Sequence, residues 1–287
     1  MKNFLHFFIG LFIVSSFFSC KKADINNDMN LASSATTSSI IQSAPYTPSS
    51  TSRVDPGAGY SIGLLADWIL LGTNKTEVHL EEDMVANGGK TGVGPAGKFK
   101  LEDDGVLNGN VYLHHGVQIV QMAGIINGSY NQEQNLASLD GELNRVAKEC
   151  ADMTPTLTLN DVQNTTTILG NGTFNVINMH KLNLDNSDQL ILSGNSSEQF
   201  IINVTYGMQL SGTAKIITAG GARSSNVLIN IIGNKSATST INNTINATIV
   251  INDGSAQLGN VNGQILCGGK QLMTADNGVY NFIPFGS

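Results

Sequence analysis

The sequence predicts a mainly β protein, a parallel β-solenoid with one long helix at its side. From Tyr60 onward, short apolar runs of strand length alternate with turns made of Gly, Asn and Asp. Asn recurs inside or beside these runs, and Pro is almost absent from them. A β-sandwich is the alternative, because the runs often lie about 8–12 residues apart, a spacing that both folds use.

Residues 1–19 are typical of a bacterial lipoprotein signal peptide. Lys2 precedes an apolar stretch from Phe4 to Phe18, which is shorter than the roughly 20 residues that cross a bilayer. Ser19, a small residue, stands directly before Cys20, as a lipoprotein signal peptidase requires. Cleavage would make Cys20 the first residue, and lipid on it would anchor the chain to a membrane. We expect the outer membrane and the cell surface; an ordinary secretory signal is the alternative.

Residues 20–56 are expected to form a flexible tether that begins with the lipidated Cys20. They are rich in Ser, Thr, Asn and Pro and show no apolar periodicity. Such a segment buries too little surface to offset the entropy lost on ordering. Residues 57–287 then form a single binding domain.

The strands of this domain are expected at the apolar runs, which are rich in β-branched residues and bounded by turn residues. The runs are Leu64–Leu71, Val111–Leu113, Val117–Val120, Phe174–Ile177, Leu190–Leu192, Phe200–Val204, Val227–Ile232, Thr248–Ile251 and Val261–Leu266.

The recurrent asparagines favour the solenoid. The residues concerned are Asn175, Asn203, Asn230, Asn242 and Asn246. Side chains of one type can align coil over coil in a β-solenoid, and Asn amides can then bond to one another. The alternative is that these residues make turns, where Asn tolerates a positive φ.

A helix is expected at about 131–153. Its apolar residues fall at intervals of three and four and therefore share one face: Leu136, Leu139, Leu143, Val146, Ala147 and Cys150. Asn131 and Gln134 resemble a capping pair, and Pro155 follows the end. We expect this face to cover apolar surface along the side of the β-solenoid.

Three segments carry a resemblance to a known family. Asn226–Gly233, Ala247–Asn252 and Gly259–Leu266 resemble the C-terminal half of the choice-of-anchor A family of surface adhesins, apart from Ile251-Asn252, where that family usually has Ala-Pro. The order of parts, with Leu64–Leu71 early, a helix inserted and β coils to the end, is similar to the ice-binding-like family. This resemblance implies a right-handed β-solenoid with a flanking helix and assigns no catalytic residue.

Composition and motifs argue against nucleic-acid binding and catalysis. The net charge is −7 and charged residues make up 13% of the chain, so phosphate neutralisation is unfavourable. A phosphate loop ending at Thr91 would need Gly where Met84 stands. His114 and His115 would point to opposite faces of a strand and share no metal. The protein is therefore expected to be no enzyme and to need no cofactor or metal.

The acidic clusters Glu81–Asp83 and Glu102–Asp104 are interpreted as solvated turns. The alternative is that they supply oxygen ligands for calcium or a carboxylate pair for sugar cleavage. If the acidic clusters bind calcium or cleave sugars, the protein would be a carbohydrate-binding or polysaccharide-degrading solenoid.

The leading hypothesis is a lipid-anchored adhesin that binds an extracellular protein matrix or glycan, and the alternative ligand is ice. Thr240, Thr244 and Thr248 recur in an uncharged stretch and are the candidate ligand-binding residues, with a polar turn as the competing interpretation. Cys150 and Cys267 would form a disulfide outside the cytoplasm or remain two buried thiols.

Overall fold

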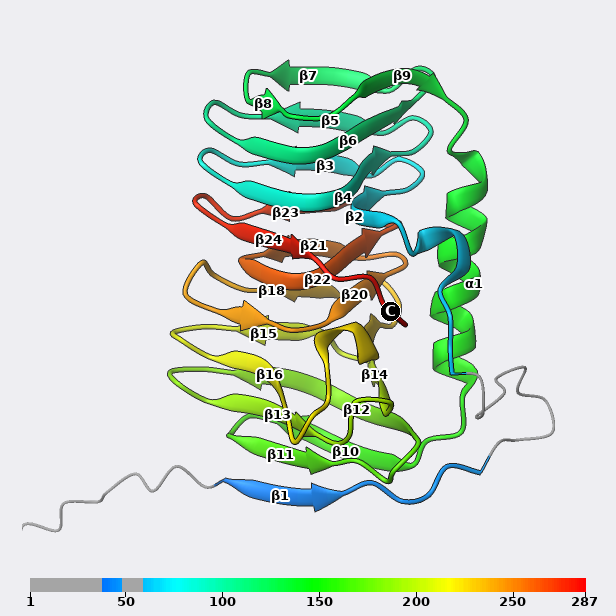
Figure 1. The fold of residues 1–287 in the computed structure, drawn as a ribbon, viewed down its shortest axis with the longest axis vertical. Coiled ribbons are helices and arrows are strands. Elements are labelled where there is room, and N and C mark those ends of the chain that lie inside the picture. Colours follow the sequence, from blue (N-terminus) through cyan, green and yellow to red (C-terminus); the bar gives the residue numbers. More distant parts are fainter. Residues whose placement is uncertain (1–37, 48–58) are drawn as a thin grey trace, which may run out of the picture. The chain divides into compact units, whose positions relative to one another are not determined.

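The computed structural model describes residues 38–47 and 59–287, all within one compact unit. They form a right-handed parallel β-solenoid with three-sided coils (Figure 1). The pairings between described strands are parallel from the lowest coil to the highest. A β-sandwich is built from antiparallel sheets, so the solenoid prediction is confirmed and the alternative is wrong.

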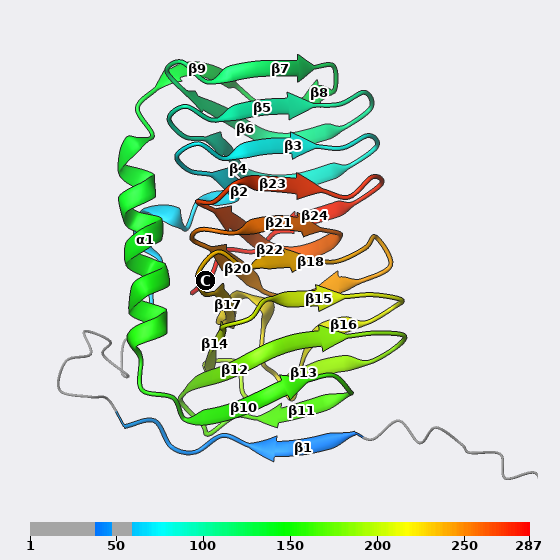
Figure 2. The same ribbon diagram turned by 180° about the vertical axis from the view of Figure 1, so that it is seen from behind.

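The chain builds the upper coils first. The strands of these coils are β2 (Trp68–Gly72), β3 (Glu77–Leu80), β4 (Val85–Val93), β5 (Lys98–Leu101), β6 (Val106–His114), β7 (Gln118–Met122), β8 (Ile125–Ile126) and β9 (Tyr130–Gln134). Helix α1 (Ala137–Asp152) then runs down the side of the solenoid (Figures 1 and 2). At about 1.5 Å per residue its 16 residues span about 24 Å, or roughly five coils.

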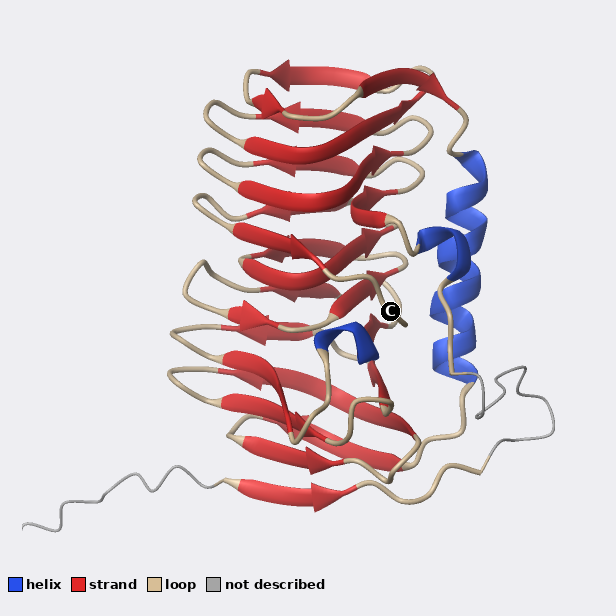
Figure 3. Ribbon diagram, viewed as in Figure 1, coloured by secondary structure: helices blue, strands red, loops and turns tan. Residues whose placement is uncertain are grey.

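From the lower end the chain climbs again. The strands of this part are β10 (Leu157–Val162), β11 (Thr166–Leu169), β12 (Phe174–Leu184), β13 (Gln189–Ser193), β14 (Gln199–Val204), β15 (Met208–Leu210), β16 (Lys215–Ala219), β17 (Val227–Ile231), β18 (Ser236–Thr238), β19 (Thr244–Ile245), β20 (Thr248–Ile251), β21 (Ser255–Leu258), β22 (Asn260–Cys267), β23 (Gln271–Thr274) and β24 (Val279–Phe282). Two short 3-10 turns, η1 (Gly63–Leu65) and η2 (Ser224–Asn226), are the remaining helical elements of the described residues and are drawn in blue with α1 in Figure 3.

The last coil of the chain lies directly beneath the first. Strands β22, β23 and β24 pair with β2, β3 and β4, respectively. The solenoid is therefore continuous in space but not along the chain, and a seam between its two ends lies in the middle of the stack.

Each coil contributes to three faces, and the long strands bend from one face to the next. The helix face carries β2, β9, β14, β17 and β20, with parts of β4, β6, β12 and β22. The charged face carries β3, β5, β7, β15, β18, β21 and β23. The ladder face carries β8, β11, β13, β16, β19 and β24, with the first residues of β4, β6 and β22.

Two apolar clusters form the core. One fills the interior of the solenoid, where inward side chains such as Phe99, Ile216 and Ile249 are fully buried. The other lies between the helix face and α1, and includes Leu143, Val146 and Leu228. The predicted apolar face of the helix is confirmed, because all six of its residues are buried in this second cluster.

The strand predicted over Leu64–Leu71 begins only at Trp68, because Gly63–Leu65 forms a 3-10 turn. The boundaries also differ from the prediction at two other places. Helix α1 begins at Ala137 rather than near Asn131, because residues 130–134 pair with β6 as strand β9; the proposed capping pair is wrong. Part of the predicted tether is ordered, because β1 (Ser39–Gln42) pairs with β11 at the lower end. Cys20 and the tether residues 20–37 and 48–56 lie outside the described residues. Within the described ranges, no helix has the length and apolar character needed to cross a membrane.

Candidate functional site

The ladder face presents a stack of asparagine side chains that spans both halves of the chain. Six residues occupy one outward position of successive coils: Asn246, Asn262, Asn281, Asn87, Asn108 and Asn127. Each side-chain amide above Asn246 donates one hydrogen bond to the side-chain carbonyl below it. The N···O distances are 2.8 Å (Asn127 to Asn108), 2.9 Å (Asn108 to Asn87), 3.0 Å (Asn87 to Asn281), 2.8 Å (Asn281 to Asn262) and 2.8 Å (Asn262 to Asn246).

A local sequence pattern positions these amides. The ladder asparagines Asn87, Asn108, Asn127 and Asn262 are each followed by Gly. The chain bends there from the ladder face to the helix face, and neighbouring coils approach closely. A Cβ atom at Gly109 would lie 2.3 Å from the carbonyl oxygen of Gly89. Asn followed by Gly therefore gives a stackable amide and then a residue small enough for the bend.

A second outward row on this face runs beside the ladder. Its members in coil order are Gln189, Lys215, Thr244, Asn260, Val279, Val85, Val106 and Ile125. Val279 is 39% exposed and Ile125 is 53% exposed. Among the outward positions of the described strands on this face, Lys215 is the single charged residue. The result is a long, uncharged surface whose amides are held in place by one another.

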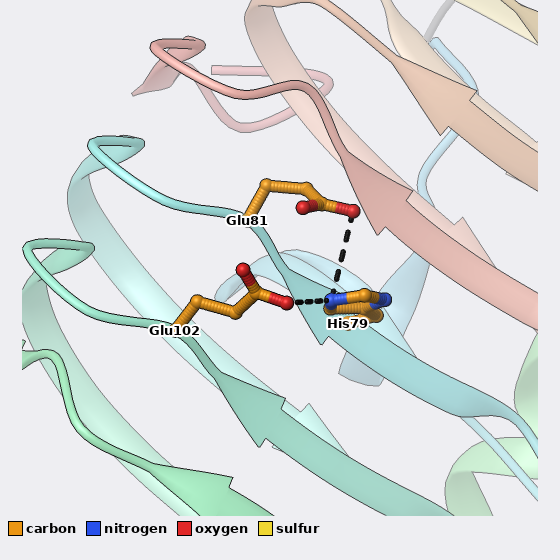
Figure 4. A group of neighbouring side chains, drawn as sticks. All are labelled: His79, Glu81 and Glu102. Atoms are coloured by element: carbon orange, nitrogen blue, oxygen red, sulfur yellow. Dashed lines mark hydrogen bonds and ion pairs between the residues drawn. The ribbon is translucent and has the colours of Figure 1, made fainter.

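The charged face has a different character in its upper coils. Glu77 and His79 of β3 point outward beside Lys98 and Lys100 of β5. His79, Glu81 and Glu102 bring their ligand atoms within 4.8 Å of one another (Figure 4). The His79 Nε2 atom lies 2.7 Å from Glu102 and 3.6 Å from Glu81.

Lys100 completes this group as an ion-pair network. Its ammonium group bonds to Glu102, and that bond, together with the one from His79, lowers the pKa of the Glu102 carboxyl group. The same contact raises the pKa of Lys100. A divalent cation would have to displace this ammonium group, so the geometry favours a salt-bridged cluster over a metal centre.

The three candidate threonines do not share a face. Thr240 is exposed in a turn, where its hydroxyl bonds to Asn243. Thr244 points outward on the ladder face. Thr248 is fully buried on β20, and its hydroxyl donates to Gln264. A joint role for the three is therefore wrong, because a spacing of four residues carries the chain around a corner; ligand binding by Thr240 or Thr244 stays a prediction.

The asparagines named from the sequence divide into two groups. Asn246 is the lowest member of the ladder, and Asn203 and Asn230 belong to a shorter stack that begins at Asn178. Asn175 instead accepts a hydrogen bond from a nearby turn, and Asn242 is exposed in a turn. The larger part of the ladder was missed, although the repeated Asn-Gly pairs would have indicated it.

The shorter stack attaches the helix. Asn203 and Asn230 donate to backbone carbonyls of α1, those of Cys150 (2.7 Å) and Ala147 (2.9 Å). The side-chain oxygen Oδ1 of Asn230 is buried and has no hydrogen-bond partner among the described residues. It lies beside a cavity of about 290 Å³ between α1 and the end of β17, which is large enough for water to supply the missing donor.

The cysteines are free thiols in separate clusters. Cys150 lies on the buried face of α1, and Cys267 lies in the solenoid interior. Burial raises the pKa of Cys150 to about 12 and that of Cys267 to about 11. Of the two alternatives left open by the sequence, the structure has two buried thiols and no disulfide between them.

The structure is similar in fold to solved structures of ice-binding proteins. One from the Antarctic ascomycete Antarctomyces psychrotrophicus is 14% identical with a TM-score of 0.55, over 80% of this chain and 99% of that chain. One from an Antarctic biological consortium is 12% identical with a TM-score of 0.54, over 83% and 96%. LeIBP from an Arctic yeast is 12% identical with a TM-score of 0.54, over 80% and 97%. The sequence matches no protein-family profile and no curated relative. The chain thus shares the β-solenoid fold of these ice-binding proteins.

Proposed function

We propose that this domain binds ice through the ladder face and has no catalytic activity. The observation that carries the proposal is the long outward surface of this face, which holds a hydrogen-bonded asparagine ladder and a single charged residue in the described strands. An ice surface is flat and uncharged, so a charged protein surface would lose hydration without gaining an ion partner.

The ladder also reduces the entropic cost of binding. An exposed asparagine normally samples several rotamers, and fixing them on a ligand costs free energy. Here each amide is already held by its neighbours at the coil spacing of about 4.8 Å. Every ladder amide keeps a second N–H group and a second carbonyl lone pair for water at the surface. The likeness in fold to proteins described as ice-binding supports the proposal without assigning a face.

The ladder face suits contact with ice better than either of the other two faces. The upper coils of the charged face carry Glu77, His79, Lys98 and Lys100 on adjacent strands. The helix face is covered by α1 over much of its length. The ladder face is therefore the one that is both uncovered and nearly free of charge.

The experiment compares two lysine substitutions on different faces. Val279→Lys places a charge at the centre of the ladder face, and Gln257→Lys places one at an exposed position of β21 on the charged face. We expect the wild-type protein and Q257K to inhibit ice recrystallisation, and V279K to do so roughly ten-fold less or worse. Equal loss in both variants would contradict the assignment of the face.

Adhesion is the second candidate, and the exposed aliphatic row favours it. Val279 and Ile125 add apolar contact area beside the amides, a mixture that suits a protein or glycan ligand. A wild-type protein that leaves ice unaffected would refute ice binding. Retention on immobilised matrix proteins or glycans, weakened by V279K, would then support an adhesin.

We also propose that the protein acts outside the cytoplasm as a lipoprotein of a bacterial outer membrane, anchored through Cys20. The support is the sequence of residues 1–20 described above. Metabolic labelling with a fatty acid tests this proposal, because Cys20→Ser should abolish the label and leave the β-solenoid folded.

A further inference from the structure

The two ends of the solenoid differ in how their cores are covered. At the lower end, β1 pairs with β11, and Tyr46 packs against Phe174 with ring centroids 5.1 Å apart. The lowest inward residues are therefore enclosed; Ile168 is fully buried and Val162 is 5% exposed.

The upper end is open. Strands β7, β8 and β9 pair with β5 and β6 on one edge, and no described strand pairs with their other edge. Ile119 and Met122 continue the interior columns of Phe99 and Leu101, yet they are 36% and 44% exposed. Val120, next to them on β7, is 50% exposed. The apolar interior and the backbone hydrogen-bonding groups of the top coil thus face outward together.

The chemistry of this end selects its partner. Unpaired strand edges are satisfied by other β-strands, and a three-sided coil is matched by another coil of the same shape. Residues 118–134 contain one charged residue, Glu133, so two such ends can approach with little repulsion. The upper end is favoured over the lower end as the contact, because the lowest inward residues, such as Ile168 and Val162, are already enclosed.

We propose that two copies of this chain pair through their upper ends about a two-fold axis, with β7 antiparallel to the β7 of the second copy. The strand β7 is favoured at the axis because it is uncharged and carries Ile119, Val120 and Met122. Pairing through β9 instead would bring Glu133 close to Glu133 of the second copy, and the two like charges would repel. An interface of this type is isologous and closes at the dimer, since it uses the open end of both copies.

The test uses the chain from Lys21 onward, which lacks the predicted signal peptide and Cys20, so lipid causes no association. Sedimentation equilibrium should give twice the mass of one chain. Val120 lies at the centre of β7 and away from the ladder face, so V120K should weaken dimerisation roughly ten-fold or more through like charges at the axis. Ile40→Lys, at the 72% exposed position of β1, is the matched control and should leave the dimer intact.

A mixture of variants distinguishes pairing from misfolding. V120K and V120E should each be monomeric and folded by circular dichroism, and mixing them should restore a dimer through opposite charges. A monomeric wild type at the highest soluble concentration would overturn the proposal. So would a dimer that V120K leaves intact or that I40K dissociates, and so would a monomer whose β7 amides resist hydrogen exchange, because another segment of the chain would then cover the end.

Discussion

Single residues set the corners between the charged face and the ladder face. Asp83, Asp104, Asn186 and Asn277 have φ between 50° and 58°, and Gly212 occupies the corresponding corner with φ 60°. Asp, Asn and Gly are the residues that tolerate this left-handed conformation. The last two residues of each acidic cluster are exposed in these turns, as the solvated interpretation expects. The first residues, Glu81 and Glu102, lie instead in the partly buried ion-pair network.

A substitution at Gly109 tests whether neighbouring coils approach each other closely. In Gly109→Ala the new Cβ would meet the Gly89 backbone at 2.3 Å, so the coils must shift, and we expect a loss of about 1–3 kcal/mol in the free energy of unfolding. Gly141→Ala is the control, because Gly141 lies in α1 with nothing within 4 Å of the added atom. That change should stabilise by about 0.5–1 kcal/mol. Urea denaturation measures both, and a neutral G109A would contradict the packing described.

The threonine and asparagine predictions differ in outcome for one physical reason. Members of a stack are separated in sequence by one full coil, as Asn246 and Asn262 are by 16 residues and Asn262 and Asn281 by 19. The threonine spacing of four is shorter than a coil and cannot place residues in one column. Coil length also varies, so no fixed repeat marks the columns in the sequence.

At the scale of elements, a polar rim attaches α1 to the solenoid beside its apolar face. Glu142 forms an ion pair with Arg145, at 2.8 Å, and accepts the backbone N–H of Leu64 at 3.3 Å. The bond from Leu64 joins the helix to the segment that leads into β2. The hydrogen bond and charge of Arg145 hold the pKa of the Glu142 carboxyl group below its usual value.

Replacing Glu142 should therefore alter stability in a pH-dependent way. A carboxyl group with a lowered folded-state pKa stabilises the fold above its unfolded pKa of about 4.3, and this contribution disappears as the pH falls through the folded pKa. We expect Glu142→Gln to destabilise at pH 7 and to match the wild type at strongly acidic pH. Urea midpoints across that range measure the difference. Asp152→Asn, which breaks an exposed pair with Lys148, should have little effect throughout; a constant E142Q deficit would contradict the ion-pair account.

The helix was predictable and β1 was not, because the two depend on different information. The helix carries its own 3.6-residue apolar period over Leu136–Cys150, which needs no partner to be recognised. Strand β1 contains two apolar residues, Ile40 and Ile41, within a Ser- and Thr-rich segment. Its order comes from β11, which lies 127 residues further along the chain.

For the molecule as a whole, the asparagine ladder joins the two halves of the chain. Asn281 belongs to the last coil and accepts a hydrogen bond from Asn87, 194 residues away in sequence. It also donates to Asn262 within its own half. One side chain therefore connects both sides of the seam.

Removing that side chain should cost more than removing the end of the ladder. Asn281→Ala breaks two ladder bonds, whereas Asn127→Ala breaks one at an exposed position. At about 0.5–1.5 kcal/mol for each bond, we expect N281A to be the more destabilising by roughly that amount. Thermal denaturation of the two variants checks this order, and equal losses would show that the ladder does not support the seam.

The sequence predicted the solenoid and its flanking helix, but it missed many of the strands and did not give the order of the coils. Strand runs and Asn recurrence are local signals, and each coil carries them. No local sequence signal in β22–β24 identifies β2–β4 as their upper neighbours, because parallel pairing uses backbone edges that every strand offers.

The position of the seam constrains how this domain can be made. The lower edges of β2, β3 and β4 receive their partners from the final residues of the chain, so the upper coils cannot be completed while synthesis is in progress. Contacts of such long sequence separation form late and slowly. The seam therefore closes only after the last strands, β22–β24, are available to pair with β2–β4, an order of events that is compatible with the export proposed above.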